Sequence, residues 1–570
     1  MKLRSFQNRS RFVFIVLSLL FCALIVRLVF VQYIYNDIFS SKARKQHTMS
    51  IKLTPKRGEI YDAKGRVLAM SVPSISVFTV PQEIKDIDVT AQKLSSLLDV
   101  DIDRIKKQLS KNKTFVYIKR KVEREKAQKL KELDLAGIYF HEENKRYYPN
   151  GSLLSHVLGF VNIDNEGLEG IELSLNRYLK GAPGFRLSEK DAAGREIIPH
   201  RFREVLPLDG NDVYLTIDEV IQHIAETELA AAIEKFKPIG ASVVVVNPKN
   251  GDILAMANWP TYDPNMFSES DPSQRRNRSV TDFFEPGSTF KTITGVSALN
   301  EGVVTLSDRF FCENGAWRVS GHTLHDSHSY GSLTFQEIIK VSSNIGICKV
   351  AKRLKEKIFY RYMKDFGFGA RTGIDFPGEV TGILRHPKHW SKLSMAALPM
   401  GQELTVTPLQ LTMAYAAVAN GGILVKPRLI RKIAAKDGTV MKEYLARPVR
   451  RVVSQKATQD ITTALKDVVG VTGTARRARL EGYSIAGKTG TAQKIGPDGR
   501  YSHTDFFASF IGFVPADNPQ VVILVSLNEP KPHYYGGVVA APAFKNIAAR
   551  VLKYLNVTPV DKEPHALTKN

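Results

Sequence analysis

The sequence predicts a mixed α/β protein of the α+β type with a single N-terminal transmembrane helix. Three features indicate this class: an apolar stretch at 12–32, strand-and-turn sequence mixed with charged helical sequence up to about residue 210, and a succession of strand, helix and strands that starts at Asp212. The chain of 570 residues exceeds the size at which one hydrophobic core stops growing, so we expect two or three folded units.

The stretch at 12–32 is interpreted as a membrane anchor. A helix of this length covers roughly 30 Å at about 1.5 Å per residue, which matches the hydrocarbon core of a bilayer. A cleavable signal peptide would have a shorter apolar core and a small-residue cleavage site, and no such site precedes Tyr33. The flank before the anchor is basic, so we expect a cytoplasmic tail at 1–11 and the chain after residue 33 outside the inner membrane.

The formal net charge of +23 implies attraction to polyanions such as nucleic acid, anionic lipid or an anionic wall polymer. A location outside the inner membrane argues against nucleic acid. Arg27 lies inside the anchor, where it either snorkels to the interface or pairs with another membrane helix. Cys312 and Cys348 are the only pair of cysteines that an oxidising compartment could join, and no metal-ligand spacing occurs, so we expect neither a metal nor another cofactor.

The segment at 33–210 is predicted to form an elongated, mixed α/β module. It opens with short β-branched and aromatic runs, separated by Gly58, Gly65, Pro73 and Pro81. Lys- and Glu-rich helical sequence follows to about residue 135, and a second strand-and-turn region completes the module.

A second domain is predicted at 211–557, followed by a C-terminal tail at 558–570. The domain begins with a strand at Asp212, a helix from Glu219 to Phe236 and two strands joined by a turn. A strand, turn and strand recur near its end, and an amphipathic helix closes it. Its sheet would therefore draw strands from both ends of the domain.

The sharpest chemical signal is the pair Ser288 and Lys291. Pro286 and Gly287 break the chain just before a helix, whose first turn places these two side chains on one face. A hydroxyl becomes a strong nucleophile when a base takes its proton, and a desolvated lysine held neutral can act as that base. A second S-x-x-K at Ser110 to Lys113 lies in a basic stretch with no preceding turn, and we interpret it as coincidence.

Two further motifs follow the first pair: Ser342-Ser343-Asn344 and Lys488-Thr489-Gly490-Thr491. Ser342 can relay a proton, and Asn344 can hydrogen-bond a peptide. The second motif can pair as a strand with a peptide backbone, while Lys488 and the threonine hydroxyls attract a terminal carboxylate. A side chain at Gly490 would obstruct the approach of that peptide to the sheet edge.

In this order, the three motifs resemble those of the penicillin-binding protein and serine β-lactamase superfamily. The segments 400–422, 485–494 and 534–544 resemble the transpeptidase domain of class B penicillin-binding proteins. Three upstream segments, 57–60, 146–149 and 167–172, resemble the N-terminal pedestal of that class. One departure is Asp62-Ala63-Lys64-Gly65, where the class usually has D-R-x-G. The resemblance implies a β-lactamase-like transpeptidase domain with a central antiparallel sheet flanked by helices.

The resemblance also implies a mechanism. Ser288 would attack the penultimate D-Ala of a peptidoglycan stem peptide, with Lys291 as base and a relay through Ser342 to the departing D-Ala. The backbone N–H groups of Ser288 and Thr491 would hold the oxyanion. The like charges of Lys291 and Lys488 would disfavour protonation of each other. A neighbouring stem's amine then completes the cross-link, and β-lactam antibiotics would inhibit by acylating Ser288.

The segment LAMSVP at 68–73 is more similar to the septal, division-specific members of the class than to the elongation members. Partners implied by that likeness are a membrane-embedded SEDS-type glycosyltransferase and other division proteins. The alternatives are an elongation-specific transpeptidase and a division scaffold with dispensable catalysis. A secreted β-lactamase would be about half as long, and a β-lactam-sensing receptor normally has several membrane spans and a cytoplasmic effector.

Overall fold

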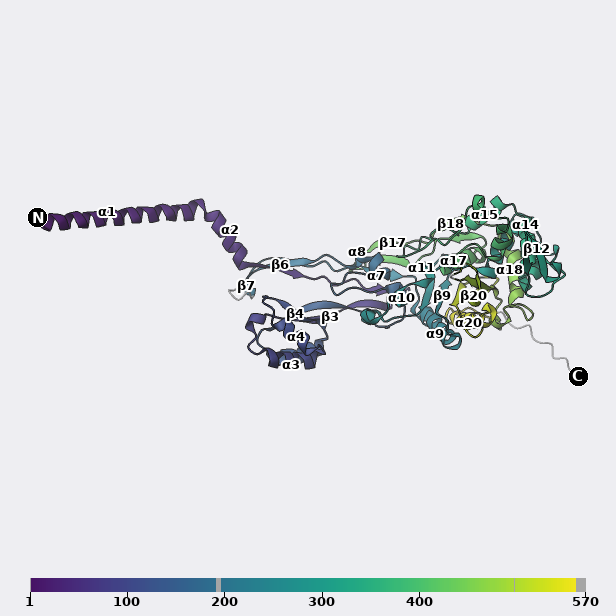
Figure 1. The fold of residues 1–570 in the computed structure, drawn as a ribbon, viewed down its shortest axis with the longest axis horizontal. Coiled ribbons are helices and arrows are strands. Elements are labelled where there is room, and N and C mark those ends of the chain that lie inside the picture. The colour runs from purple at the N-terminus through teal and green to yellow at the C-terminus, as the bar shows by residue number, and fades with distance from the viewer. Residues whose placement is uncertain (1, 191–195, 497, 560–570) are drawn as a thin grey trace. The chain divides into compact units, whose positions relative to one another are not determined.

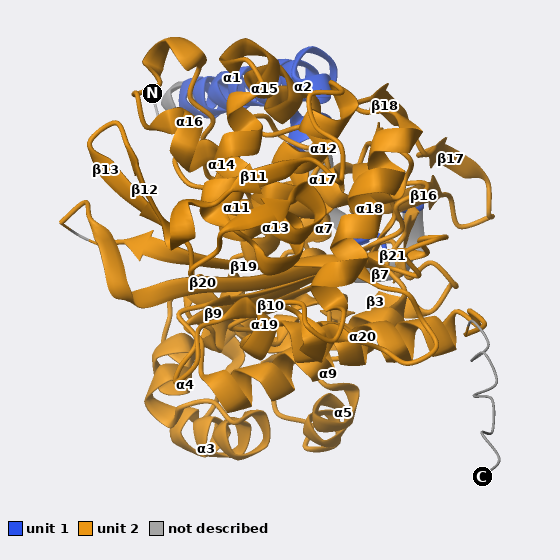
Figure 2. Ribbon diagram, turned by 90° about the vertical axis from the view of Figure 1, so that its right-hand side faces the viewer, with its two compact units in different colours: residues 1–56, 181–209 blue, residues 57–180, 210–570 orange. Residues whose placement is uncertain are grey.

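The computed structural model describes residues 2–190, 196–496 and 498–559, so the tail predicted at 558–570 lies outside the described residues from position 560 onward. The chain divides into two compact units (Figure 2). One unit comprises 1–56 and 181–209, and the other comprises 57–180 and 210–570.

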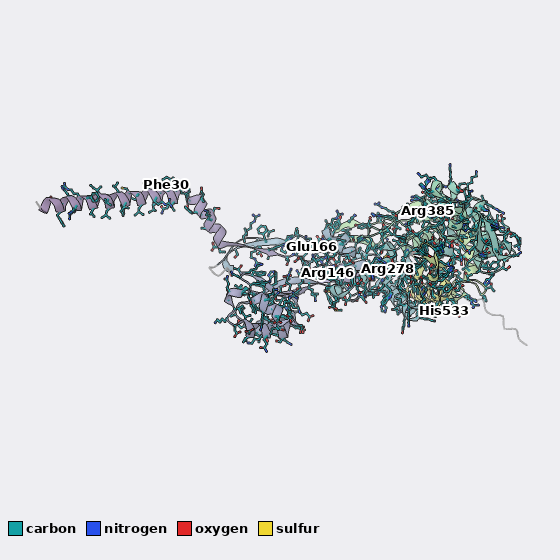
Figure 3. The ribbon with its side chains drawn as sticks, in the orientation of Figure 1. Phe30, Arg146, Glu166, Arg278, Arg385 and His533 are labelled. Carbon is teal, nitrogen blue, oxygen red and sulfur yellow. The ribbon has the colours of Figure 1, made fainter. Side chains whose placement is uncertain are left out.

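The smaller unit contains the N-terminal helix. Its helical elements are α1 (Lys2–Val29), a π-helical turn η1 (Phe30–Ile34) and α2 (Asn36–His47), of which α1 and α2 are labelled in Figure 1. The span Phe6–Ile34 has a mean hydropathy of 2.9 and no part buried in the protein, and its apolar side chains, Phe30 among them, are exposed (Figure 3). This helix fits the predicted single-pass anchor, although it already begins at Lys2 rather than at residue 12. The unit also contains an antiparallel sheet of β1 (Thr48–Leu53), β6 (Gly184–Lys190) and β7 (Glu196–Val205).

The larger unit is built around a five-stranded antiparallel sheet, visible in Figure 2. In spatial order its strands are β10 (Ile253–Trp259), β9 (Gly240–Val246), β21 (Val521–Asn528), β20 (Tyr501–Val514) and β19 (Ala486–Ile495). Every residue of β9 is buried, as expected for a short apolar run in the centre of a covered sheet. The prediction that the sheet draws strands from both ends of the domain is confirmed.

Helices cover both faces of this sheet (Figure 2). On one face lie α9 (Glu219–Phe236) and α20 (Ala541–Tyr554), and on the other lie α12 (Lys291–Asn300), α17 (Pro408–Ala419) and α18 (Gln455–Val469). Helix α17 is mostly apolar, and all of its residues except Ala419 are buried. The predicted architecture of a central antiparallel sheet between helices is confirmed.

A second sheet combines early and late parts of the chain. Its strands are β17 (Val440–Glu443), β16 (Ile430–Ala434), β8 (Asp212–Leu215), β2 (Ile60–Tyr61), β3 (Val67–Thr79), β4 (Val116–Val122) and β5 (Ile138–Tyr147), which pairs with β3. Strand β3 continues through Pro73, where the sequence predicted a break. The pairing of β3 with β2 ends at Ala69, and its pairing with β4 starts only at Ile75. Pro73 lies between these two paired segments, so neither β2 nor β4 requires the backbone N–H that proline lacks.

Strand β4 was not predicted, because the whole stretch to residue 135 was interpreted as helical. The helices there are α3 (Ile87–Leu98), α4 (Ile102–Leu109) and α5 (Arg124–Glu132), and β4 lies between the last two. Its first residues alternate, with Val116 and Ile118 buried and Tyr117 and Lys119 half-buried. This short period-2 pattern was the available signal, and the surrounding lysines obscured it.

A buried cluster of ions ties the early segments of the larger unit together. Arg57 Nε lies 2.5 Å and Arg146 Nε lies 2.6 Å from the two carboxylate oxygens of Glu172, and all three side chains are almost fully buried (Figure 3 labels Arg146). Burial by itself raises the pKa of Glu172, but the two guanidinium groups outweigh it and hold this pKa below its usual value.

Replacing Glu172 with alanine is expected to destabilise the larger unit by about 3–5 kcal/mol, because two buried guanidinium groups lose their counter-charge. Urea unfolding of the full chain in detergent measures this effect. The folded pKa of Glu172 lies below its ordinary value, so its stabilisation is present at neutral pH and is lost as the pH falls through that folded pKa. Glu132→Ala, at an exposed position of α5, is the control and should change stability by less than about 0.5 kcal/mol. Equal effects of the two substitutions would contradict the prediction.

Candidate active site

The turn that carries Ser288 is the short 3-10 segment η4 (Gly287–Phe290), which leads directly into α12. Gly287 has φ +53° and Gly401 has φ +85°, a region that favours glycine. The two backbones are in direct contact: Gly287 N donates to Gly401 O at 3.1 Å, and a Cβ on Gly401 would lie 2.2 Å from Gly287 O. The turn before Ser288 is therefore fixed by close packing of main chain on main chain.

The structure brings the first two predicted motifs together. Lys291 is fully buried, and its Nζ donates to Ser342 O at 2.5 Å, to Ser342 Oγ at 3.1 Å and to Asn344 Oδ1 at 2.7 Å. Ser288, one turn earlier, is half-buried and lines the same cleft as Ser342 and Asn344. Ser288 thus lines the cleft one turn before a buried amine, and among the described residues the two side chains form no hydrogen bond with one another.

Ser342 and Asn344 are oriented by a break between two helices. Helix α13 (Phe335–Val341) ends at Ser342, which has φ +63°, and α14 (Asn344–Lys352) begins two residues later. The left-handed conformation is uncommon for a serine and costs conformational energy. It reverses the chain so that both motif side chains reach Lys291.

Lys488, on β19, is the second buried amine of the site. Its side chain is fully buried, and among the described residues its Nζ has no hydrogen-bond partner. Burial, reinforced by the charge of Lys291, lowers its pKa well below the ordinary value. Burial also lowers the pKa of Lys291 to about 8, while the charge of Asp326 acts in the opposite direction. The sequence predicted both desolvation of Lys291 and mutual repulsion of the two lysines. Burial is the larger cause at both residues, and the effect of the like charge is found at Lys488 and not at Lys291.

The other residues of the third motif lie along the edge of the central sheet. Strand β19 is the last strand in the sheet order, and no described strand pairs with its outer side, which could therefore pair with an extended peptide. Thr489 and Thr491 line the cleft, and Thr491 Oγ1 accepts from Gly536 N at 3.1 Å. The motif is therefore placed where a bound strand would run.

Gly490 has a different role from the one that the sequence suggested. A Cβ there would lie 2.4 Å from Ser509 Oγ and 2.9 Å from Thr289 Cγ2, so it would point toward the turn that carries Ser288. The missing side chain lets β19 pack closely against this turn. It does not make room for an incoming peptide strand. This corrects the reason given for Gly490.

Gly490→Ala is expected to push β19 away from the turn that carries Ser288. Overpacking of this kind costs about 1–3 kcal/mol of stability, and the displaced turn should lower acylation by β-lactams roughly 10-fold or more. Labelling rates with fluorescent penicillin and thermal unfolding measure the two effects. Gly331→Ala is the matched control, because a Cβ there would meet only one atom within 4 Å, at 3.9 Å. Equal behaviour of the two variants would refute the packing role.

The cleft in front of Ser288 has a volume of about 880 Å³. Its walls come from the loop after a hairpin (325–328), the loop 471–477, the β19 edge and the segment 534–538. Phe506 and Tyr534 stack at a centroid separation of 4.1 Å and form an aromatic wall. Asp326 and this wall were not singled out as site residues from sequence, because only the fold brings them to the cleft.

The remaining sequence candidates lie outside the site. Ser110 is exposed at the end of α4, where its hydroxyl donates to Lys106 O at 2.7 Å, and it does not line the cleft. Cys312 and Cys348 are both buried and are not bonded to one another. Cys348 Sγ instead donates to Ala396 O at 2.8 Å.

Comparisons with known proteins agree on one family. Residues 241–549 match the model for the penicillin-binding protein transpeptidase domain, and residues 52–215 match that for the penicillin-binding protein dimerisation domain. Stage V sporulation protein D of Bacillus subtilis is 37% identical over 98% of this chain and 88% of its own length. The peptidoglycan D,D-transpeptidase FtsI of Escherichia coli is 34% identical over 97% of this chain and 92% of its own length.

A solved structure has the same fold. The crystal structure of penicillin-binding protein 3 from Mycobacterium tuberculosis, complexed with aztreonam, aligns with a TM-score of 0.70 at 28% identity. The alignment covers 90% of this chain and 98% of the solved one.

Proposed function

Since this chain belongs to the class B penicillin-binding proteins, a family of serine-type peptidoglycan D,D-transpeptidases, we propose that it cross-links stem peptides through an acyl-enzyme on Ser288. The observation that carries this proposal is the environment of Lys291. Its amine is buried, has a lowered pKa and contacts both Ser342 and Asn344. These are the properties that a base next to a serine nucleophile requires.

In the acylation step, Ser288 Oγ attacks the carbonyl carbon of the penultimate D-Ala, and its proton passes to the neutral amine of Lys291. The bond to the terminal D-Ala breaks as a proton reaches the leaving amine through Ser342. The 3.1 Å contact between Lys291 Nζ and Ser342 Oγ supports this relay. The backbone N–H groups of Ser288 and Thr491 would stabilise the oxyanion.

In the second step, the side-chain amine of a neighbouring stem peptide attacks the ester carbonyl. A new amide bond forms, and Ser288 recovers its proton. Before either step, the donor peptide would lie along the β19 edge, with Lys488, Thr489 and Thr491 around its terminal carboxylate and Asn344 on its backbone. The Nζ of Lys488 is fully buried and has no hydrogen-bond partner in the part of the chain that the structure describes, which supports this arrangement because an anionic partner would compensate its poor solvation.

A cellular role at the division septum is part of the proposal. The segment at 68–73 and the extent of the likeness to FtsI support this role. The elongation role and the scaffold role remain the alternatives, and the similarity to a stage V sporulation protein adds a role in sporulation. We also propose a SEDS-type glycosyltransferase and other division proteins as membrane partners.

The proposed organisation follows the sequence: a cytoplasmic tail at 1–11, an inner-membrane anchor at 12–32, a pedestal at 33–210, and a periplasmic transpeptidase domain at 211–557. The matches to the dimerisation and transpeptidase models, at 52–215 and 241–549, support the order of the last two parts. The apolar helix Phe6–Ile34 supports the single membrane span.

The experiment that tests the function supplies the full chain, in detergent, with lipid-linked peptidoglycan precursor that a separate glycosyltransferase polymerises. We expect release of D-Ala together with cross-linked peptides in chromatography of the digested product. Polymer that forms without D-Ala release, in the presence of a folded chain whose Ser288 is labelled by penicillin in a separate assay, would favour the scaffold role. A fluorescent fusion that follows the lateral wall and not the septum would favour the elongation role.

A further inference from the structure

The carboxylate of Asp326 lines the cleft and has no role in the reaction steps proposed above. Asp326 follows a hairpin of β12 (Ala316–Val319) and β13 (His322–His325), which projects at one side of Figure 2. Its backbone N–H donates to Gly315 O at 3.1 Å, which fixes the exit of the hairpin. Among the described residues that line the cleft, Asp326 is the one carboxylate.

Asp326 holds the start of α14 through three hydrogen bonds. Its Oδ1 accepts from Asn344 N at 2.5 Å and from Ile345 N at 3.1 Å, and its Oδ2 accepts from Ser343 Oγ at 2.7 Å. Ser343 Oγ in turn accepts from Gly346 N at 2.9 Å. The carboxylate thus satisfies backbone donors at a helix start, where a negative charge is favourable.

These contacts also orient the side-chain amide of Asn344. Asn344 Nδ2 donates to His325 O at 2.9 Å, and Asn344 Oδ1 accepts from Lys291 Nζ at 2.7 Å. Asn344 is therefore held by Asp326 through its backbone, by the neighbouring residue of the hairpin through its amide nitrogen, and by the buried lysine through its amide oxygen. A shift of Asp326 would move an acceptor of the Lys291 amine.

We propose that Asp326 is a positioning residue of the transpeptidase: it fixes Asn344 against Lys291 and supplies a negative charge near the buried amine of Lys291. This inference rests on the proposed function, and it adds a carboxylate that acts through the S-x-N motif without touching the substrate. It also makes the hairpin exit part of the machinery that orients the active site.

Because Asp326 is charged and lies near Lys291, the proposal predicts a change in the pH dependence of acylation. The charges of Asp326 and Cys348 act on the pKa of Lys291, and the charge of Lys291 acts on the pKa of Lys488. The charge of Asp326 also acts on the pKa values of Cys312 and Tyr330. Loss of the Asp326 charge removes an anion that favours the protonated form of Lys291. The neutral base would then form at lower pH, which shifts the midpoint of the acylation profile downward.

The test compares Asp326→Asn and Asp326→Glu with the wild type, as full chains in detergent. The readout is the rate of acylation by fluorescent penicillin per active site, measured from pH 6 to about pH 10. Asp375→Asn is the matched control, because Asp375 is exposed and pairs with Lys426 at 3.1 Å, and neither residue lines the cleft. Thermal unfolding of each variant reports its folding.

Asp326→Asn is expected to lower the high-pH plateau about 10- to 100-fold, because hydrogen bonds to a charged group are lost, and to move the midpoint to lower pH. Asp326→Glu keeps the charge, so its midpoint should stay near that of the wild type while its plateau is reduced. The control should match the wild type in both respects.

Three results would overturn the proposal. They are an unchanged plateau, an unchanged midpoint in Asp326→Asn, and a plateau loss that only follows the fraction of unfolded protein. The second would remove the role of the Asp326 charge, and the third would mean that Asp326 only stabilises the fold. If the wild type is labelled at Ser288 and Asp326→Asn has the same plateau and midpoint, the inference about Asp326 fails while the proposed function stands. If the wild type takes no label, the proposed function fails with it.

Discussion

Ser288→Ala is expected to abolish covalent labelling by fluorescent penicillin, because the acyl-enzyme needs the Ser288 oxygen as its nucleophile. The structure provides a matched control in Ser110→Ala. Both serines belong to an S-x-x-K sequence, but Ser110 is exposed at the end of α4 and its hydroxyl donates to a helix carbonyl. Ser110→Ala should therefore label like the wild type.

The assay is gel fluorescence of the full chain after incubation with the probe, with thermal unfolding as a check on folding. Ser288→Ala removes one oxygen at a half-buried position, so it should leave the stability within about 0.5 kcal/mol of the wild type. Persistent label on a folded Ser288→Ala chain would show that another residue is the nucleophile.

Lys291→Ala is expected to lower the acylation rate by about 10²- to 10⁴-fold, the usual contribution of a positioned general base. Burial lowers the pKa of Lys291 to about 8. The amine acts as a base only in its neutral form, so the wild-type rate should fall as the pH drops below about 8 and level off above it. Stopped-flow or quenched labelling across this range measures the profile.

The control for Lys291→Ala is Lys113→Ala, the lysine of the second S-x-x-K, which is exposed. Its rate and its pH profile should equal those of the wild type. A midpoint near 10, typical of an exposed lysine, would contradict the buried environment assigned to Lys291. An undiminished rate in Lys291→Ala would remove this residue from the mechanism.

The three motifs were recognisable from sequence because each is short and local. Ser288 and Lys291 lie one turn apart, and the residues of each other motif are consecutive, so their spacing survives in any fold that keeps the local structure. The strands and helices at 212–258 and 509–554 were equally predictable, because long apolar runs and a period of 3.6 residues determine them.

Features that depend on distant contacts were not predictable in the same way. Strand β4 exists because β3 offers it a partner, and Pro73 is tolerated because β3 changes neighbours at that point. The contacts of Asp326 join residues 17 to 19 positions apart through a hairpin that the sequence does not announce. The reason for Gly490 also appears only when β19 lies against the turn that carries Ser288.

The most direct test of the central claim is to locate the acyl group by mass spectrometry. The full chain is incubated with penicillin and digested with trypsin, which cleaves after Arg278 and Lys291 and so isolates the peptide 279–291. The account predicts that this peptide gains the mass of the opened β-lactam at Ser288. An adduct on another peptide, or none on a folded chain, would contradict it.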